Sequence, residues 1–129
     1  MKKIWFLLKV ILALFLIFGG IQHFISPNNY IAFVPSFLPF TIAIIYVTGL
    51  FEILFGLALF FKKLEIIGAW GVLILMLLFL PIHMWDVFSE APAIGSRNAA
   101  LIRLPIQFLL IGIAWKVKNN VSQYKLTKP

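Results

Sequence analysis

Four long apolar runs constrain this chain more than any other feature of its sequence. Each has about 20 residues, the length that an α-helix needs to cross roughly 30 Å of hydrocarbon. Lipid offers the peptide backbone no hydrogen-bond partners, and a helix satisfies its backbone within one segment. The sequence therefore predicts an all-α integral membrane protein, a four-transmembrane-helix antiparallel bundle. The expected spans are residues 4–25, 41–61, 64–85 and 99–117.

The composition fits a membrane protein and leaves little room for a second, soluble domain. Of the 129 residues, 63% are hydrophobic and 12% are charged, whereas a soluble domain carries about 25% charged residues. We therefore expect a single membrane domain over residues 1–129. The chain has no cysteine, which excludes disulfide scaffolding, thiol redox chemistry and thiolate metal sites.

The positive charges follow the ends of the apolar runs. The formal net charge is +7, but no basic face is left for a phosphate backbone, so nucleic acid is not an expected partner. With the N-terminus inside, the inner side carries nine lysines, while the outer side carries Arg97 and, just within the fourth span, Arg103. This asymmetry predicts that both termini are cytoplasmic (N-in/C-in). The lysines are Lys2, Lys3, Lys9, Lys62, Lys63, Lys116, Lys118, Lys125 and Lys128.

The first apolar run begins with basic residues, as a signal peptide does. We expect it to be retained, because the run is long and the following "FISPNN" lacks a small-x-small cleavage site. The stretch "FKKLE" predicts a tight inner turn. The longer outer connection "SPNNYIAFVPSFLPF" is expected to lie along the membrane surface, with room for one short interfacial helix.

Polar residues within the spans fall on stripes of small residues. In the second span, Glu52 shares one helical face with Gly49 and Gly56. Small residues mark the places where membrane helices pack closely, so we expect Glu52 to face the interior of the bundle. The matching stripes of the first, third and fourth spans are Ala13, Leu16, Gly20, His23; Val72, Met76, Phe79, His83; and Arg103, Gln107, Leu110, Ala114.

Depth along the helices suggests which of these polar groups meet. At about 1.5 Å per residue, Glu52 lies roughly 16 Å from the outer end of its span. Gln107 then lies about 12 Å deep and Arg103 about 6 Å. Gln107 is therefore the closer match for Glu52, although a shift of one turn in the fourth span would bring Arg103 level.

An ionisable residue inside a membrane is costly, and its default interpretation is functional. The alternative is that Glu52 with Gln107, or Glu52 with Arg103, only fastens two helices. Such polar contacts contribute about 0.6 kcal/mol on average in bilayers. A carboxylate is an inefficient choice for so small a gain, so we favour a ligand or proton site.

His23 and His83 lie near the outer interface, where a histidine can reach water without having a function. They are candidate members of a polar pocket. As a metal site they lack a third ligand with convincing spacing, since Asp86 is the only candidate, and zinc sites use at least three protein ligands. We therefore expect no metal.

The chain resembles the DoxX family of small bacterial membrane proteins over nearly its whole length. Four patterns occur in the family's order: H-F-x-x-P and V-P-x-x-L-P around the first outer connection, G-x-x-E-x-x-x-G in the second span, and R-L-P-x-Q in the fourth. The segments are "FGGIQHFISPNNYIAFVPSFLP", "YVTGLFEILFGLALFF", "LLFLPIHMW" and "LIRLPIQFLLIGIAW". The positions that match are His23, Pro27, Pro35, Pro39, Gly49, Glu52, Gly56, Pro81, Arg103, Pro105 and Gln107.

This resemblance implies a four-helix domain in the bacterial inner membrane. For some relatives it also implies association with quinone-linked oxidation of sulfur compounds or with redox-defence complexes. Some members of the redox-partner branch carry cysteines, and this chain has none, so thiol chemistry does not carry over. Membership of a family supports a fold better than a reaction.

Our first functional hypothesis is a small-molecule binding subunit of a redox-associated membrane complex. Its ligand site would be lined by His23, Glu52, His83, Arg103 and Gln107 and would hold a small amphipathic ligand, with a quinone as the candidate. No intrinsic cofactor is expected, because the sequence has no flavin, haem-attachment or iron–sulfur pattern, so a protein partner would supply the redox chemistry.

Two other classes remain open. One is a non-catalytic structural membrane partner, in which the buried polar groups only lock the bundle. The other is an enzyme that acts on a lipid-soluble substrate with Glu52 as general acid or base, by analogy with four-helix sterol-isomerase-like membrane proteins.

Overall fold

The computed structural model of the protein describes residues 2–127, without the side chains of residues 124 and 125. Within this range the chain forms four α-helices and one short 3-10 helix and is otherwise loops. They are α1 (Lys2–Ile25), η1 (Pro27–Phe33), α2 (Thr41–Ala58), α3 (Glu65–Phe88) and α4 (Arg97–Thr127). The four α-helices are each long and apolar enough to cross a membrane, so the prediction of an all-helical chain with four such segments is confirmed.

The C-terminal ends of α2 and α4 differ from the predicted spans, because an apolar run and a helix need not end at the same residue. The fourth helix continues to Thr127 instead of ending near residue 117, because its polar continuation leaves the apolar run without breaking the helix. The second helix ends at Ala58, before residue 61. Of the lysines expected on the inner side, the side chain of Lys125 and all of Lys128 lie outside the described residues.

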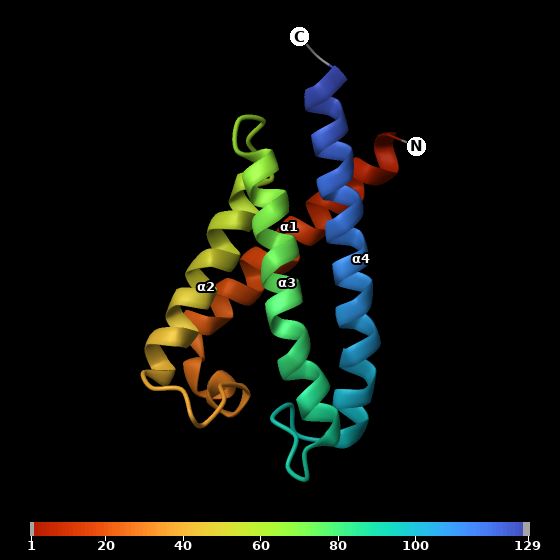
Figure 1. Cartoon of the computed structure of the whole chain (residues 1–129). Coiled ribbons are helices and arrows are strands. Elements are labelled where there is room, and N and C mark those ends of the chain that lie inside the picture. Colours follow the sequence, from red (N-terminus) through yellow and green to blue (C-terminus); the bar gives the residue numbers. More distant parts are fainter. Residues whose placement is uncertain (1, 128–129) are drawn as a thin grey trace.

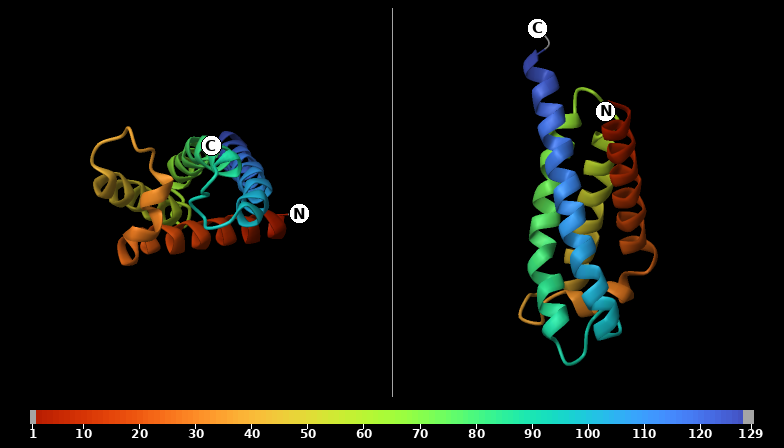
Figure 2. Two further views of the ribbon diagram at one scale, coloured as in Figure 1. Left: turned by 90° about the horizontal axis from the view of Figure 1, so that it is seen from below. Right: turned by 90° about the vertical axis from the view of Figure 1, so that its right-hand side faces the viewer.

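Consecutive α-helices run in opposite directions (Figure 1). The start of α1, the end of α4 and the α2–α3 turn therefore lie at one end of the molecule, which we call the terminal end, while η1 and the α3–α4 loop lie at the other, the loop end (Figures 1 and 2). α1 packs mainly on α2, and α3 mainly on α4. Contacts of α2 with α3 and of α1 with α4 join these two pairs.

Glycines bring the backbones of α1 and α2 together. A Cβ atom on Gly20 would lie 2.5 Å from the carbonyl oxygen of Gly49, and one on Gly49 would lie 2.5 Å from the Cβ of His23. The predicted inward stripe of α2 is confirmed, because Gly49, Glu52 and Gly56 are all buried. The predicted stripe of α1 is confirmed as well, with Ala13, Gly20 and His23 among its buried residues. This packing places Glu52 of α2 against α1.

α2 and α3 touch near the terminal end and diverge toward the loop end (Figure 1). At their contact, a Cβ on Gly68 would lie 2.9 Å from the Cβ of Ala58 and 2.9 Å from the carbonyl oxygen of Phe55. No comparably close glycine contact joins these helices at the loop end within the described residues. The two helices thus form a V whose open side lies at the loop end.

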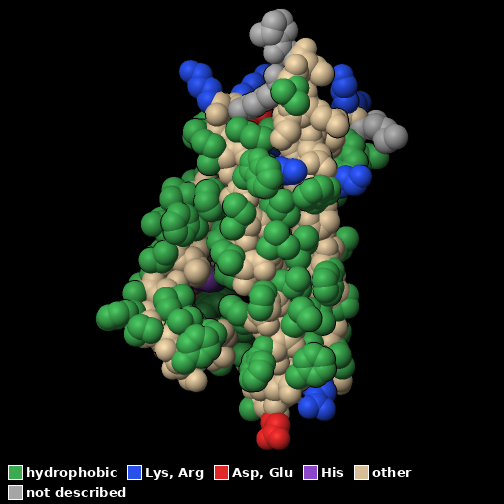
Figure 3. Space-filling model, in the orientation of Figure 1, with side chains coloured by type: hydrophobic (Ala, Val, Ile, Leu, Met, Phe, Trp, Pro, Cys, Tyr) green, Lys and Arg blue, Asp and Glu red, His purple; other side chains and the backbone are tan. Residues whose placement is uncertain are grey.

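Large apolar side chains cover the outside of the helices (Figure 3). Phe18 is 64% exposed, Leu78 62% and Ile102 64%, which suits a surface that faces lipid rather than water. Near the terminal end, the buried Lys118 holds its Nζ 4.6 Å from the Trp70 ring and 4.1 Å from the Trp115 ring. These cation–π contacts give Trp70, in the second turn of α3, a charged partner.

The α1–α2 contact can be tested with an alanine. Gly49→Ala should lower the free energy of unfolding by about 1–3 kcal/mol, because the new methyl group forces apart two backbones in contact. Gly112→Ala is the matched control, since a Cβ there meets nothing within 4 Å. Thermal unfolding of the detergent-solubilised variants, followed by circular dichroism, makes the comparison. Equal melting of the two variants would contradict the close crossing.

Candidate functional site

A pocket of about 160 Å³ lies at the loop end, between α1, α2 and α3, with η1 against it and Arg103 of α4 at its edge. Six of its lining residues are apolar: Phe33, Val34, Ile44, Ile45, Phe79 and Ile82. Six polar residues complete the lining: His23, Tyr30, Thr48, Glu52, His83 and Arg103. A dry protein cavity of about 150 Å³ holds benzene, so this pocket has room for one six-membered ring.

One end of the pocket is formed by Glu52 and His23. The ring Nδ1 of His23 donates to the carbonyl oxygen of Ile45 at 2.9 Å. This bond fixes the ring and turns Nε2 toward Glu52, whose Oε1 lies 3.8 Å away. The other carboxyl oxygen, Oε2, lies 3.1 Å from where a Cβ on Gly19 would be. The absent side chain of Gly19 therefore leaves the space that the carboxyl group occupies.

Both members of this pair are buried, with Glu52 6% and His23 8% exposed. A buried charge is tolerated only when it is paired or hydrogen-bonded. Within the described residues, the only oppositely charged or chargeable group within 4 Å of the Glu52 carboxyl is the His23 ring. At 3.8 Å the two groups are too far apart for a direct hydrogen bond. A ligand atom or a water molecule beside the pair can therefore hydrogen-bond to both groups and exchange a proton with either.

The other end of the pocket is formed by Arg103 and His83. The Nε of Arg103 lies 3.2 Å from Nδ1 and 3.4 Å from Nε2 of the His83 ring. Because this Nε is almost equally far from both ring nitrogens, the guanidinium lies against the imidazole ring and does not point at the lone pair of a single ring nitrogen. Its Cζ is also 5.8 Å from the centre of the Phe33 ring. Within residues 2–127 no acceptor binds the two terminal amino groups of Arg103, which leaves donors for a ligand.

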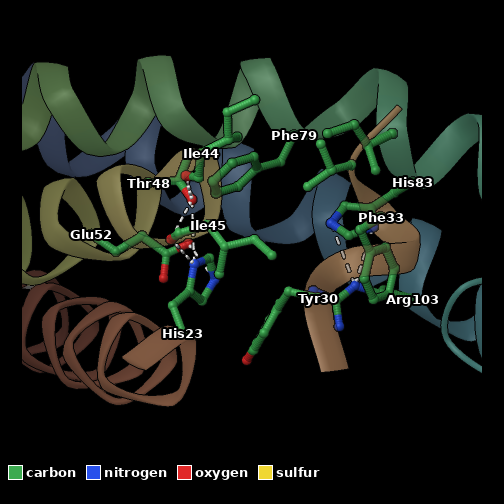
Figure 4. A pocket seen from close by; sticks show the side chains of 12 residues that line it. His23, Tyr30, Phe33, Ile44, Ile45, Thr48, Glu52, Phe79, His83 and Arg103 are labelled. Carbon is green, nitrogen blue, oxygen red and sulfur yellow. Dashed lines mark hydrogen bonds and ion pairs between the residues drawn. The ribbon is translucent and has the colours of Figure 1, made fainter. Parts of the chain in front are cut away.

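Tyr30 of η1 lies between the two ends (Figure 4). Its ring centre is 4.1 Å from that of His23. Burial raises the pKa of the Tyr30 phenol, and a negative charge on Glu52 raises it further, against the opposite effect of Arg103. The phenol therefore keeps its proton near neutral pH and remains a hydrogen-bond donor.

The structure brings together four of the five residues predicted for the ligand site. His23 and Glu52 lie at one end of the pocket, and His83 and Arg103 at the other (Figure 4). The fifth, Gln107, is buried but does not line the pocket, and its Nε2 donates to the carbonyl oxygen of Met76 at 2.7 Å. Gln107 thus fastens α4 to α3, and the pairing with Glu52 favoured from depth is not formed among the described residues.

Two of the six polar residues that line the pocket were not predicted from the sequence. Thr48 lies one turn before Glu52 on the same face of α2, so the i, i+4 spacing carried a signal for it. Its hydroxyl donates to the carbonyl oxygens of Ile44 and Ile45, at 2.9 and 3.0 Å. Tyr30 lies in a short 3-10 helix, where no period marks an inward face.

Asp86, which the sequence offered as a third metal ligand beside His23 and His83, does not line the pocket. Its carboxylate accepts from the backbone N–H groups of Ala93, at 2.5 Å, and Ile94, at 3.3 Å. It therefore holds the α3–α4 loop against the end of α3. Among the described residues, no group of three His, Cys, Asp or Glu side chains is arranged to hold a metal ion.

Gln107→Leu separates helix fastening from the pocket. Loss of the bond to Met76 should lower the free energy of unfolding by about 0.6–1.7 kcal/mol, while the pocket lining stays intact. Gln22→Leu is the control, because within the described residues the side chain of Gln22 makes no hydrogen bond. Chemical denaturation in detergent measures both. A Gln107→Leu variant as stable as Gln22→Leu would show that the contact contributes nothing.

Comparison with known proteins places the chain in a family without assigning it an activity. A domain of unknown function, DUF8561, matches residues 12–118, a range that contains every residue lining the pocket. No curated protein and no solved structure matches the chain. The resemblance to the DoxX family stays a prediction. Because the match spans most of the sequence, the chain belongs to the DUF8561 family.

Proposed function

We propose that this chain is a multi-pass protein of the bacterial inner membrane that binds the ring of a small lipid-soluble carbonyl compound, a quinone, in the loop-end pocket. Its termini would be cytoplasmic. Lysines and arginines gather at the terminal end (Figure 3), whereas the described loop end carries Arg97 and Arg103. This asymmetry supports the orientation through the positive-inside rule.

The observation that carries the ligand proposal is the distribution of polar groups in the pocket. Hydrogen-bonding groups stand at two ends, and apolar and aromatic side chains lie between them (Figure 4). A quinone has carbonyl oxygens on opposite sides of a flat apolar ring. Arg103 supplies donors for one oxygen, and Glu52 with His23 faces the other. Small-molecule sites commonly combine apolar walls with a few polar groups that fix orientation.

The way into the pocket suits a ligand dissolved in lipid. A hollow opens sideways between α2 and α3, with a histidine visible inside it (Figure 3). Ile44 of α2 and Ile82 of α3 line the pocket from the two sides. A ligand therefore passes from the bilayer between two helices without crossing a polar surface.

The pocket volume also separates candidate ligands. About 160 Å³ accommodates one ring with small substituents, and a sterol would require α2 and α3 to move further apart. This observation favours a quinone over the sterol-like substrates of the enzyme hypothesis.

The residues of the site would manage protons rather than electrons. Reduction of a quinone to a quinol takes up two electrons and two protons. Glu52 and His23 can exchange protons with the oxygen beside them, while the electrons would come from a redox-complex protein partner. The DoxX resemblance points toward the same kind of complex.

A purely structural role for the buried acid has less support. In a helix clasp, Glu52 would bind Gln107 or Arg103 of α4. Among the described residues, Gln107 binds Met76 and Arg103 binds His83 instead. The carboxyl group is left beside the pocket.

Binding of duroquinone tests the ligand proposal. It should raise the melting temperature of the detergent-purified protein, and Arg103→Gln or Glu52→Gln should weaken its apparent affinity by about tenfold, the effect of losing a hydrogen bond of about 1.4 kcal/mol. Arg97→Gln and Glu90→Gln repeat these chemical changes at exposed positions outside the pocket. Equal responses from site and control variants, or stabilisation by cholesterol as large as by duroquinone, would refute the proposal.

The orientation has its own test, made simple by the absence of cysteine. In bacterial spheroplasts, Ser96→Cys at the loop end should react with a membrane-impermeant maleimide. Lys63→Cys, in the α2–α3 turn, should react only after lysis. The reverse pattern would place the termini outside, and labelling of both positions in intact spheroplasts would contradict the spanning arrangement.

A further inference from the structure

A second hollow lies at the terminal end, the end of the molecule opposite the loop-end pocket. α1 runs diagonally from α2 at the loop end to α4 at the terminal end (Figure 1). Beside this second crossing is a groove of about 580 Å³, which we call the basic groove. Its polar lining includes Lys2 and Lys9 of α1, Lys62 of the α2–α3 turn, and Asn120 of α4.

The charges of the basic groove are not balanced within the described chain. Lys9 pairs with Glu65 through Nζ and Oε1 at 2.5 Å, and the two side chains are only 19% and 15% exposed. That pair uses the one acidic residue lining the groove. Lys2 and Lys62 line the same groove and form no ion pair within residues 2–127. Two positive charges are thus available for an anion.

Asn120 supplies a hydrogen-bond donor that lacks an acceptor. Its side-chain Nδ2 is buried and makes no hydrogen bond; no other buried side-chain nitrogen or oxygen among the described residues is in this state. A buried donor without a partner costs free energy. An anionic oxygen bound in the groove can satisfy it.

Four apolar side chains also line the groove. Trp5 and Phe6 of α1 and Val117 and Val121 of α4 lie along the groove. A free anion would leave the half-buried Trp5 and the exposed Phe6 uncovered. A molecule with an anionic head and hydrocarbon chains would use both parts, with its head beside the lysines and its chains against the apolar side chains.

We propose that the basic groove binds an anionic phospholipid of the leaflet at the terminal end. Its phosphate would contact Lys2, Lys62 and Asn120, and an acyl chain would cover Trp5 and Phe6. The site is separate from the quinone pocket, and it does not depend on the function proposed for that pocket.

Titration with lipids in maltoside micelles tests the site. Dioleoylphosphatidylglycerol should raise the melting temperature, while dioleoylphosphatidylcholine should not. The Lys62→Gln variant should need about fivefold more phosphatidylglycerol to reach half of its melting-temperature shift, because it lacks one lysine near the lipid surface. Lys63→Gln removes the same charge one position away, outside the groove lining, and should respond as the wild type does.

A second pair of variants tests the donor. Asn120→Leu should weaken the phosphatidylglycerol response, and Asn119→Leu, which lies outside the groove lining, should not. The proposal would be overturned by equal stabilisation from phosphatidylcholine, or by responses of Lys62→Gln and Asn120→Leu equal to those of their controls. Inorganic phosphate that stabilises as strongly as phosphatidylglycerol at equal concentration would indicate an anion site instead of a lipid site.

Discussion

The contact between the backbones of α1 and α2 is the constraint on which the loop-end pocket depends. Gly20 and Gly49 leave no room for a side chain between the helices. Association of helices in lipid relies on packing and polar contacts, since lipid tails are as apolar as the helices, so a close crossing of small residues has particular weight. It also fixes where the side chains near it must go. The side chains of His23 and Glu52 lie close together because the backbones of α1 and α2 are in contact beside them.

The pocket combines this crossing with the divergence of α2 from α3. The α1–α2 crossing brings Glu52 and His23 together, and the divergence of α2 from α3 leaves space beside them. His83 and Arg103 complete the arrangement from the α3–α4 pair. Polar groups in lipid normally satisfy one another, yet here several face a common space. That pattern is typical of a binding site, where the ligand supplies the missing partner.

Much of this arrangement follows from helical periodicity in the sequence. The spacing of Gly49, Glu52 and Gly56 correctly predicted the buried face of α2. Depth alone did not predict the place of Gln107, because a position along one helix does not determine which neighbour its side chain meets; that depends on helix rotation and tilt. Tyr30 escaped prediction since its 3-10 helix has no buried side among the described residues. The predicted end of α4 was wrong because hydropathy marks where an apolar run ends, and a helix can continue beyond that point.

The ion pair between Lys9 and Glu65 joins α1 to α3. The other side-chain hydrogen bonds described between α-helices stay within a pair: His23 with α2, and Gln107 and Arg103 with α3. Among the described side chains, the hydrogen bond that joins the two pairs of α-helices therefore lies at the terminal end, whereas at the loop end Arg103 of α4 contacts the Phe33 ring of η1. Widening the loop end would break no described hydrogen bond between the α-helices, but it would separate Phe33 from Arg103 and His83. The pocket entrance is thus held by ring and cation–π contacts, which are non-directional compared with hydrogen bonds and tolerate small shifts.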